Sequence, residues 1–298
     1  MRRRLPADVL LLATVLCWSF NFTVVKYALT HGWEPLSYSS VRFAIGAVVF
    51  SAVTVGREGS LRVRRRHVPV MLGAAVVGIW LNQLTFSYSV RLTTAATVAL
   101  MFGTLPIFVA LIAQALGVER LRFRHWVATV VSFSGVALVA LGSSGGLGSD
   151  LGGILLGLGA AATWAAYSVA IGPLMQRYSP YRISAFMLLV GSVPLLLSSV
   201  RQLADQDWAG LGGLAWAAFV YSLFFSLVFT NIWWFEAIDR VGPSRASLYA
   251  NLNPFLGAFF ALVVLSEEMG PLQFAGGLVI GAGILLARLA RPPAPSPE

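Results

Sequence analysis

Long apolar runs of about 20 residues alternate with short polar or charged links along the whole chain. A helix needs about 20 mostly apolar residues to cross roughly 30 Å of hydrocarbon. The pattern predicts an all-α integral membrane protein with ten transmembrane helices, because no link is long enough to form a soluble domain. The predicted spans are 8–28, 36–56, 68–90, 93–116, 124–142, 151–172, 181–200, 211–235, 243–265 and 271–289.

The composition supports a membrane protein and excludes several other classes. Hydrophobic residues make up 57% of the 298 and charged residues 11%, which leaves too little polar surface for a water-soluble globule. The net charge is +9, but the arginines cluster between apolar runs, so we expect no nucleic-acid partner. Cys17 is the single cysteine, which excludes an intrachain disulfide and a cysteine metal cluster.

The distribution of arginine and lysine predicts the orientation. With ten spans, 17 of the 21 basic residues fall on the side of the N-terminus. Positive charge stays in the cytoplasm, so we expect a multi-pass protein with both termini cytoplasmic. Arg2–Arg4 precede an apolar run that no small-residue cleavage pattern follows, which indicates a retained first span.

An internal repeat divides the chain. The segment "TTAATVALMFGTLPIFVALIAQALGVERL" aligns with "GPSRASLYANLNPFLGAFFALVVLSEEM". Residues 148 positions apart form the pairs Pro106 and Pro254, Glu119 and Glu267, and Gly135 and Gly283. We therefore predict repeats at 1–148 and 149–290, each with five spans, and a disordered proline-rich tail at 291–298. Five is odd, so the second copy is inverted, which is typical of alternating-access transporters with a central cavity.

Three segments carry a family resemblance. "CWSFNFTVVKYAL", "SYSSVRFAIGA" and "TLPIFVALIAQALGVERL" resemble the EamA-type repeat of the drug/metabolite transporter superfamily, which implies a ten-helix transporter without a cofactor. The aromatic richness also resembles that of bacterial aromatic amino acid exporters. This implies an inner-membrane exporter of amino acids with aromatic or large hydrophobic side chains. The second half departs from the pattern, because Gly172 stands near the place of Lys26 and "ISAFMLLVG" contains no arginine.

Aromatic and amide residues near the middle of several spans predict the substrate site. Membrane tryptophans usually prefer the interfaces, so Trp18 and Trp164 at mid-depth suggest a polar cavity. We expect spans one, three, four, six, eight and nine to line this cavity. The alternative explanations for these residues are aromatic packing between helices and interhelical hydrogen bonding. The candidate substrate-binding residues are Trp18, Asn21, Phe22, Asn82, Phe86, Met101, Trp164, Tyr167, Ser168, Tyr249 and Asn253.

Pro106 and Pro254 are candidate hinges. Each is expected to lie mid-helix, where it deletes one backbone hydrogen bond and frees the carbonyl four residues earlier, at Phe102 and Ala250. In hydrocarbon such a carbonyl must find protein, water or substrate. The alternative is a pair of tolerated kinks.

Two cations in the first half are candidates for charge roles. Lys26, the only lysine, lies near the outer boundary of its span, where it can snorkel to water, attract a substrate carboxylate or pair with Glu34. Arg42 lies deeper and is expected in a structural pair, a carbonyl cap or contact with substrate. Glu119 and Glu267 are expected to cap or brace helix ends.

The remaining patterns concern coupling and packing. No Asp or Glu lies in the middle of a predicted span, which favours facilitated, uniport-like transport over proton coupling.

The stripes Gly153-x-x-x-Gly157 and Gly277-x-x-x-Gly281 indicate close helix packing inside one protomer. Spans five and ten are expected at the periphery, where they leave open a homodimer in the bilayer.

Other functional classes fit less well. An ATP-driven pump needs a Gly-Lys-Ser or Gly-Lys-Thr loop, and the single lysine precedes Tyr27. A membrane-embedded enzyme needs paired carboxylates, a histidine cluster or an activated nucleophile, and none is visible, so we predict no catalytic and no metal site. A channel is disfavoured by the repeated halves. Nucleosides, hydrophobic drugs and other small metabolites remain alternative substrates.

Overall fold

The computed structural model describes residues 6–117, 123–142 and 151–289, and every regular element within these ranges is helical. The segments of the first half are α1 (Ala7–Thr30), α2 (Pro35–Glu58), η1 (Arg65–His67), α3 (Val68–Ala75), η2 (Val76–Leu81), α4 (Asn82–Leu92), α5 (Ala95–Phe102), α6 (Leu105–Ala115) and α7 (Phe123–Leu141). Those of the second half are α9 (Leu151–Met175), α10 (Pro180–Asp205), α11 (Gly213–Tyr221), η3 (Ser222–Phe229), α12 (Thr230–Ala250), α13 (Asn253–Val264) and α14 (Pro271–Leu289).

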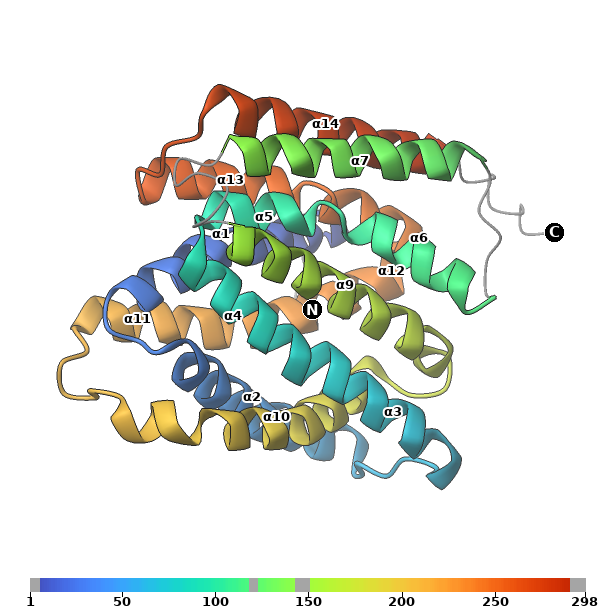
Figure 1. Cartoon of the computed structure of the whole chain (residues 1–298). Helices are drawn as coiled ribbons and strands as arrows, with labels where there is room; N and C mark the ends of the chain where they lie inside the picture. The colour runs from blue at the N-terminus through green and yellow to red at the C-terminus, as the bar shows by residue number, and fades with distance from the viewer. Residues whose placement is uncertain (1–5, 118–122, 143–150, 290–298) are drawn as a thin grey trace.

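The described helices confirm the prediction of an all-α protein with ten spans. Eight are long and apolar enough to cross a membrane, and the shorter apolar helices Asn253–Val264 and Pro271–Ala287 supply the other two. The spans run alternately toward the two ends of the molecule in Figure 1. The predicted repeat boundary at 148, the tail at 291–298 and Glu119 lie outside the described residues.

Spans five and ten form a pair at one edge of the bundle. α7 and α14 pack along each other, outside α5 and α13 in Figure 1. Glycines allow this contact, because a Cβ built on Gly135 would lie 2.7 Å from the Gly276 carbonyl oxygen. The two predicted stripes also pack inside the chain: Gly157 faces Met101, and Gly277 faces Leu100. These glycines therefore serve contacts within the protomer.

The helices of the fourth and ninth spans are each interrupted by a short break, at equivalent positions in the two repeats. α5 stops at Phe102 and α6 starts at Leu105, while α12 stops at Ala250 and α13 starts at Asn253. The expectation that Pro106 and Pro254 lie mid-helix is therefore wrong. Each occupies the first turn of a new helix, where the missing N–H costs no intrahelical bond. The breaks adjoin, since a Cβ on Gly103 would lie 3.5 Å from the Pro254 Cβ.

The boundary between the eighth and ninth spans also differs from the prediction. The sequence predicts a link at 236–242, but α12 continues to Ala250 and the break falls at Asn251 and Leu252. The charged stretch "FEAIDRV" consists mostly of residues compatible with a helix. Charge therefore marks the membrane edge here without ending the helix.

Spans three and eight each contain a π-helical segment. η2 covers Val76–Leu81 and η3 covers Ser222–Phe229, so the two begin 146 residues apart, close to the offset of the sequence repeat. A π-helical turn is wider than an α-helical one and often occurs at functional sites. η3 packs against α1, and η2 packs against α9. We call these contacts the first crossing and the second crossing.

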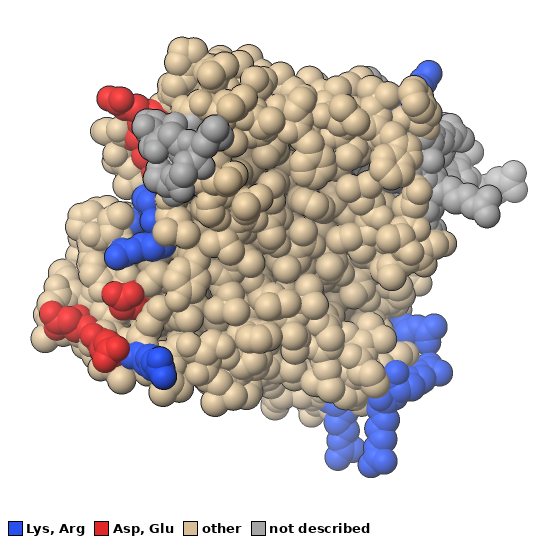
Figure 2. Space-filling model, viewed as in Figure 1, with Lys and Arg blue, Asp and Glu red and all other residues tan. Residues whose placement is uncertain are grey.

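Charged side chains gather at the ends of the bundle. In Figure 2 the basic side chains protrude over the region where α3 begins, and acidic side chains lie at the opposite end together with basic ones. The flank of the bundle between the two ends is formed almost wholly by uncharged residues in this view. We call the end where α3 begins the arginine-rich end.

Candidate functional site

A chain of hydrogen bonds centred on Arg42 connects spans from both halves of the protein. Arg42 of α2 donates from Nη2 to Oε1 of Gln83 in α4 at 2.9 Å, and from Nη1 to the hydroxyl of Ser222 in η3 at 2.5 Å. Ser222 in turn donates to Oδ1 of Asn21 in α1 at 2.6 Å. Gln83 donates to Oδ1 of Asn82 at 3.1 Å. We call these five residues the Arg42 network.

The network continues into span six through Asn82. Its Nδ2 donates to the Ala160 carbonyl oxygen at 2.8 Å and lies 3.2 Å from the Thr163 hydroxyl, both in α9. Polar side chains thus link α1, α2, α4, η3 and α9 within the apolar bundle. Two predicted site residues, Asn21 and Asn82, lie at the two ends of this chain of bonds.

Arg42 is a buried cation with neutral partners. Its side chain is 4% exposed, and in the described part of the chain the ion pairs join Arg182 to Glu58 and Arg240 to Glu236, so none involves Arg42. Its Nε makes no hydrogen bond. The Tyr38 hydroxyl lies near Arg42 and Ser222, yet it meets no partner in hydrogen-bond geometry. Nε of Arg42 and the Tyr38 hydroxyl are thus two buried groups outside hydrogen-bond geometry, and the guanidinium lies over the rings of Tyr38 and Phe43.

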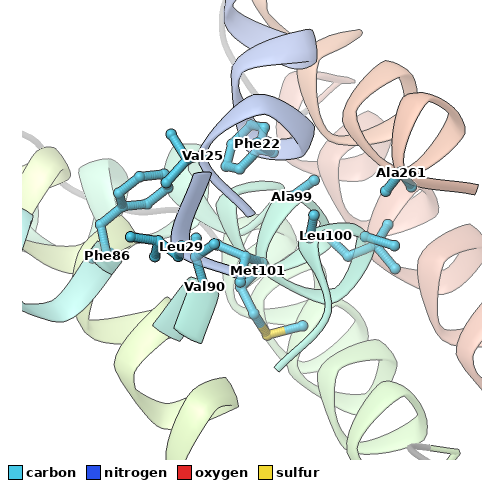
Figure 3. Packing of buried hydrophobic residues seen from close by; sticks show 14 of the residues in the cluster. Phe22, Val25, Leu29, Phe86, Val90, Ala99, Leu100, Met101 and Ala261 are labelled. Atoms are coloured by element: carbon cyan, nitrogen blue, oxygen red, sulfur yellow. The ribbon is translucent and has the colours of Figure 1, made fainter. Parts of the chain in front are cut away.

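Three phenylalanines form an aromatic cluster, and two of them lie within one helical turn of network residues on the same helix. Phe22 follows Asn21 in α1, and its ring centroid is 5.9 Å from that of Phe86 in α4 and 5.4 Å from that of Phe102. Phe86 lies one turn after Gln83. Figure 3 shows Phe22 and Phe86 approaching from their two helices. Phe22 and Phe86 were predicted at the site, and the structure adds the Phe102 ring.

Met101, another predicted site residue, is a packing residue. Its side chain is completely buried, and a Cβ on Gly157 of α9 would lie 3.1 Å from it. Figure 3 shows Met101 beside Val90 and Leu29 in the same apolar core. The methionine therefore fills the space between α5 and α9.

Trp18 binds the π-helical segment at the first crossing. Its indole N–H donates to the Ser226 carbonyl oxygen of η3 at 3.2 Å, and its ring lies 5.1 Å from that of Trp234. One residue later, the Ser19 hydroxyl donates to Oδ1 of Asn253 in α13 at 2.7 Å. Trp18 and Asn253 thus both lie within one turn of Asn21.

The equivalent residues of span six meet the second crossing differently. Tyr167 packs directly on η2, because a Cβ on Gly78 would lie 2.4 Å from Tyr167. Trp164 lies against Tyr167 with ring centroids 5.1 Å apart. The Ser168 hydroxyl donates to the Trp164 carbonyl oxygen of its own helix. Steric contact takes the place of the hydrogen bond that Trp18 makes.

Tyr249, another predicted site residue, bonds the start of α1. Its hydroxyl donates to Oδ1 of Asp8 at 2.9 Å, at the first turn of α1. Asp8 and Asn21 are thirteen residues apart, which is about 20 Å along a helix. Tyr249 therefore fastens α12 to the start of α1.

Lys26 and Arg91 cap each other's helices. Lys26 of α1 donates to the carbonyl oxygens of Val90 and Thr93 at 2.9 and 2.7 Å, at the end of α4. Arg91 of α4 donates to the Leu29 carbonyl oxygen at 2.6 Å, at the end of α1. A cation is stabilised at a helix C-terminus by the free carbonyls and the dipole. The structure thus gives Lys26 a capping role.

Glu267 caps a helix of the other repeat. Its two carboxylate oxygens accept the backbone N–H groups of Ala95 and Ala96 at 2.8 and 3.0 Å, at the first turn of α5. The expected capping role of Glu267 is confirmed. It also joins the end of span nine to the start of span four.

The sequence did not single out Ser222 and Tyr38. Tyr38 lies one helical turn before Arg42, a spacing that could have indicated a shared site. Ser222 begins the apolar run "SLFFSLVF", where a single hydroxyl carries no distinctive signal. Its role depends on the fold, because it is 180 residues from Arg42.

Comparison with known proteins assigns the family. The model of the EamA-like transporter family matches residues 5–141 and 151–289, one copy for each half. A probable terminal-alkyne amino-acid exporter of Streptantibioticus cattleyicolor is 28% identical over 93% of this chain and 91% of its own. The uncharacterized inner membrane transporter YedA of Escherichia coli is 24% identical over 96% and 92%.

A solved structure supports the fold. A crystal structure covers 98% of this chain and 99% of its own with a TM-score of 0.67, at 21% sequence identity. The two family matches coincide with the two structural halves and, together with the relatives, extend over nearly the whole chain. The chain therefore belongs to the EamA-like transporter family.

Proposed function

We propose that this transporter exports amino acids with aromatic or other large hydrophobic side chains by alternating access, with Arg42 binding the substrate carboxylate. The observation that carries the proposal is a buried guanidinium that makes no ion pair in the described part of the chain, while Phe22 and Phe86 lie close along α1 and α4 to residues of its hydrogen-bond network. Each part of an apolar amino acid then has a counterpart in the protein.

The electrostatics favour an anionic ligand at Arg42. Removing a charge from water costs several kcal/mol per ion after relaxation, and neutral hydrogen bonds offset only part of that cost. A carboxylate would accept from the free Nε–H of Arg42 and from the Tyr38 hydroxyl. Charge-assisted hydrogen bonds of this kind contribute about 1.5 to 3 kcal/mol each.

The surroundings of Arg42 suit the rest of an amino acid. Phe22 and Phe86 lie within one helical turn of Asn21 and Gln83, and with Phe102 they form a buried apolar cluster. The Asn21 amide precedes Phe22 in α1, and its Oδ1 accepts the Ser222 hydroxyl. The substrate class agrees with the amino-acid exporter of Streptantibioticus cattleyicolor, although that name describes only the relative.

The two halves provide the means of alternating access. Both contain a π-helical segment and a broken helix, and the breaks adjoin near the centre of the bundle. We propose that Pro106 and Pro254 mark the hinges and that transport is uniport-like. The excess of arginine at one end supports an inner-membrane protein with both termini in the cytoplasm.

The test is transport by the purified protein in liposomes. A panel of radiolabelled amino acids is loaded, and exchange is compared with that of empty vesicles. We expect phenylalanine, tryptophan, leucine and methionine to exchange faster than alanine or glutamate. Arg42→Gln should reduce phenylalanine exchange by about 10- to 100-fold, since one charge-assisted bond is lost.

Two controls make the result decisive. Arg42→Lys keeps the charge without the planar fork, and we expect intermediate exchange. Monodisperse gel filtration of each variant shows that the fold is kept. If no amino acid crosses faster than through empty vesicles, the substrate class is wrong.

A further inference from the structure

A second cluster of basic residues surrounds a hollow at the arginine-rich end, away from the Arg42 network. The hollow has a volume of about 260 Å³ and is lined by Arg64, His67, Arg177 and Tyr178. Arg64 and His67 lie just before α3, while Arg177 and Tyr178 lie in the turn between α9 and α10. The hollow therefore lies where a loop of the first repeat meets a turn of the second, at the arginine-rich end.

Tyr178 holds the hollow in shape. Its hydroxyl accepts the backbone N–H of Arg64 at 3.0 Å and lies 2.7 Å from Nδ1 of His67. The rings of His67 and Tyr178 meet edge to face with centroids 5.5 Å apart. The loop before α3 is thus fixed onto the turn between α9 and α10, so the two arginines are presented on a defined surface.

Within the described ranges, the ion pairs leave the positive charge in the hollow without a paired carboxylate. Glu58, the acidic residue at the end of α2, pairs with Arg182 at 2.8 Å and accepts the Ser179 hydroxyl. In the residues that the structure describes, no ion pair involves Arg64 or Arg177. Both arginine side chains are accessible, so they are free to bind an anion from outside the protein.

The electrostatics of His67 agree with an unbalanced positive field. Partial burial, followed by the positive charges of Arg66, Arg177 and Arg64, lowers the pKa of the His67 imidazole. An anion held between the arginines would oppose these charges and raise that pKa again. The imidazole therefore reports on occupancy of the hollow.

We propose that this hollow binds a phosphate group, presented either by an anionic phospholipid or as free phosphate. Arginine forks match phosphate oxygens, and the start of the span at α3 adds the favourable end of a helix dipole. Basic pockets between transmembrane helices at the cytoplasmic surface suit lipid headgroups. This site is separate from the proposed substrate site. It would give the arginines a binding role in addition to setting the orientation of the protein in the membrane.

The experiment follows the histidine signals by NMR while inorganic phosphate is added to the full chain in neutral detergent. His67→Gln identifies the His67 signal among the three histidines. We expect phosphate to raise the midpoint of the His67 titration, and Arg64→Ala or Arg177→Ala to weaken the phosphate affinity by about tenfold. Arg124→Ala, at the start of α7, removes one accessible cation outside the hollow and should leave the affinity unchanged.

Nanodiscs distinguish the two sources. If discs with phosphatidylglycerol shift the His67 titration without added phosphate, and phosphatidylcholine discs do not, the ligand is a lipid headgroup. A response to inorganic phosphate with no difference between the discs supports the free anion. The proposal fails if chloride at matched ionic strength gives the same shift as phosphate, or if Arg124→Ala weakens the affinity as much as Arg177→Ala.

Discussion

Each of the two crossings contains a π-helical segment, but the side-chain contacts at the two crossings differ. At the first crossing, α1 meets η3 through hydrogen bonds: Trp18 binds the Ser226 carbonyl, and Asn21 binds Ser222. At the second crossing, α9 meets η2 by close packing of Tyr167 on Gly78. Gly78 and Ser226 are 148 residues apart, so they are equivalent positions in the repeat.

This difference shows that two repeats of one fold can carry different polar contacts at corresponding crossings. Both halves contain a crossing. Among the buried side chains described, the one charged group, Arg42, belongs to the first half. The stretch "ISAFMLLVG" in α10, the counterpart of α2, contains no arginine. Under the proposed function, a pseudo-symmetric scaffold would hold an asymmetric substrate, with its carboxylate directed toward Arg42 in the first half. The experiments below are designed to break one crossing at a time.

The largest effect on stability is expected from Gly78→Val. A Cβ at this position would already lie 2.4 Å from Tyr167, so the second crossing must open. We expect a loss of about 3 kcal/mol in the free energy of unfolding, the upper end of the usual range for overpacking. Unfolding in mixed micelles measures it. Gly73→Val, where nothing lies within 4 Å, is the matched control, and an equal loss there would contradict the packing argument.

A smaller loss is expected from Ser222→Ala at the first crossing. The change leaves Nη1 of Arg42 and Oδ1 of Asn21 without the hydroxyl that joins them. We expect a loss of about 1 to 2 kcal/mol in unfolding free energy, because buried polar groups lose a partner. Ser134→Ala removes an exposed hydroxyl that bonds its own helix and should be near neutral. Equal losses for the two variants would mean that the hydrogen bonds of Ser222 between the halves contribute nothing to the free energy of unfolding.

Lys26→Met tests the reciprocal caps of α1 and α4. The long apolar side chain preserves packing but removes the bonds to Val90 and Thr93. We expect a loss of about 1 kcal/mol in unfolding free energy, typical of a cation at a helix C-terminus. Phenylalanine exchange should persist. An exchange rate as low as that of Arg42→Gln would instead place Lys26 in the substrate path.

The smallest effect is expected from Trp18→Phe. This change keeps an aromatic ring near Trp234 and removes the N–H that donates to Ser226. A single neutral hydrogen bond contributes about 0.5 to 1.5 kcal/mol. Trp126→Phe on the exposed face of α7 is the comparison. A loss of unfolding free energy no larger than that of the control would remove the hydrogen bond from the description of the first crossing.

Local patterns in the sequence were enough to predict the membrane fold. Run length predicted ten spans, and the offset of 148 residues between Pro106 and Pro254 predicted the repeat. The prolines were misplaced within their helices because proline is equally compatible with a kink and with a first turn. The π-helical segments had no visible signal, since "VVGIWL" and "SLFFSLVF" are ordinary apolar runs.

The site was only partly predictable because its contacts are distant in sequence. Asn21, Phe22, Asn82, Phe86 and Arg42 were singled out as polar or aromatic residues within spans. Which of them share a network depends on tertiary packing, as the 180 residues between Arg42 and Ser222 show. Met101 packs in the same apolar core as Phe22 and Phe86, whereas Tyr249 donates to Asp8 at the start of α1, and no local pattern distinguishes these two outcomes.

The most direct test of the central claim compares phenylalanine with phenethylamine, which has the same ring and amine but no carboxylate. Each competes for labelled phenylalanine exchange in liposomes containing the wild type or Arg42→Gln. We predict that phenylalanine competes at least about tenfold better in the wild type, and that the preference falls to about twofold or less in the variant. An undiminished preference in Arg42→Gln would contradict the assignment of the carboxylate to Arg42.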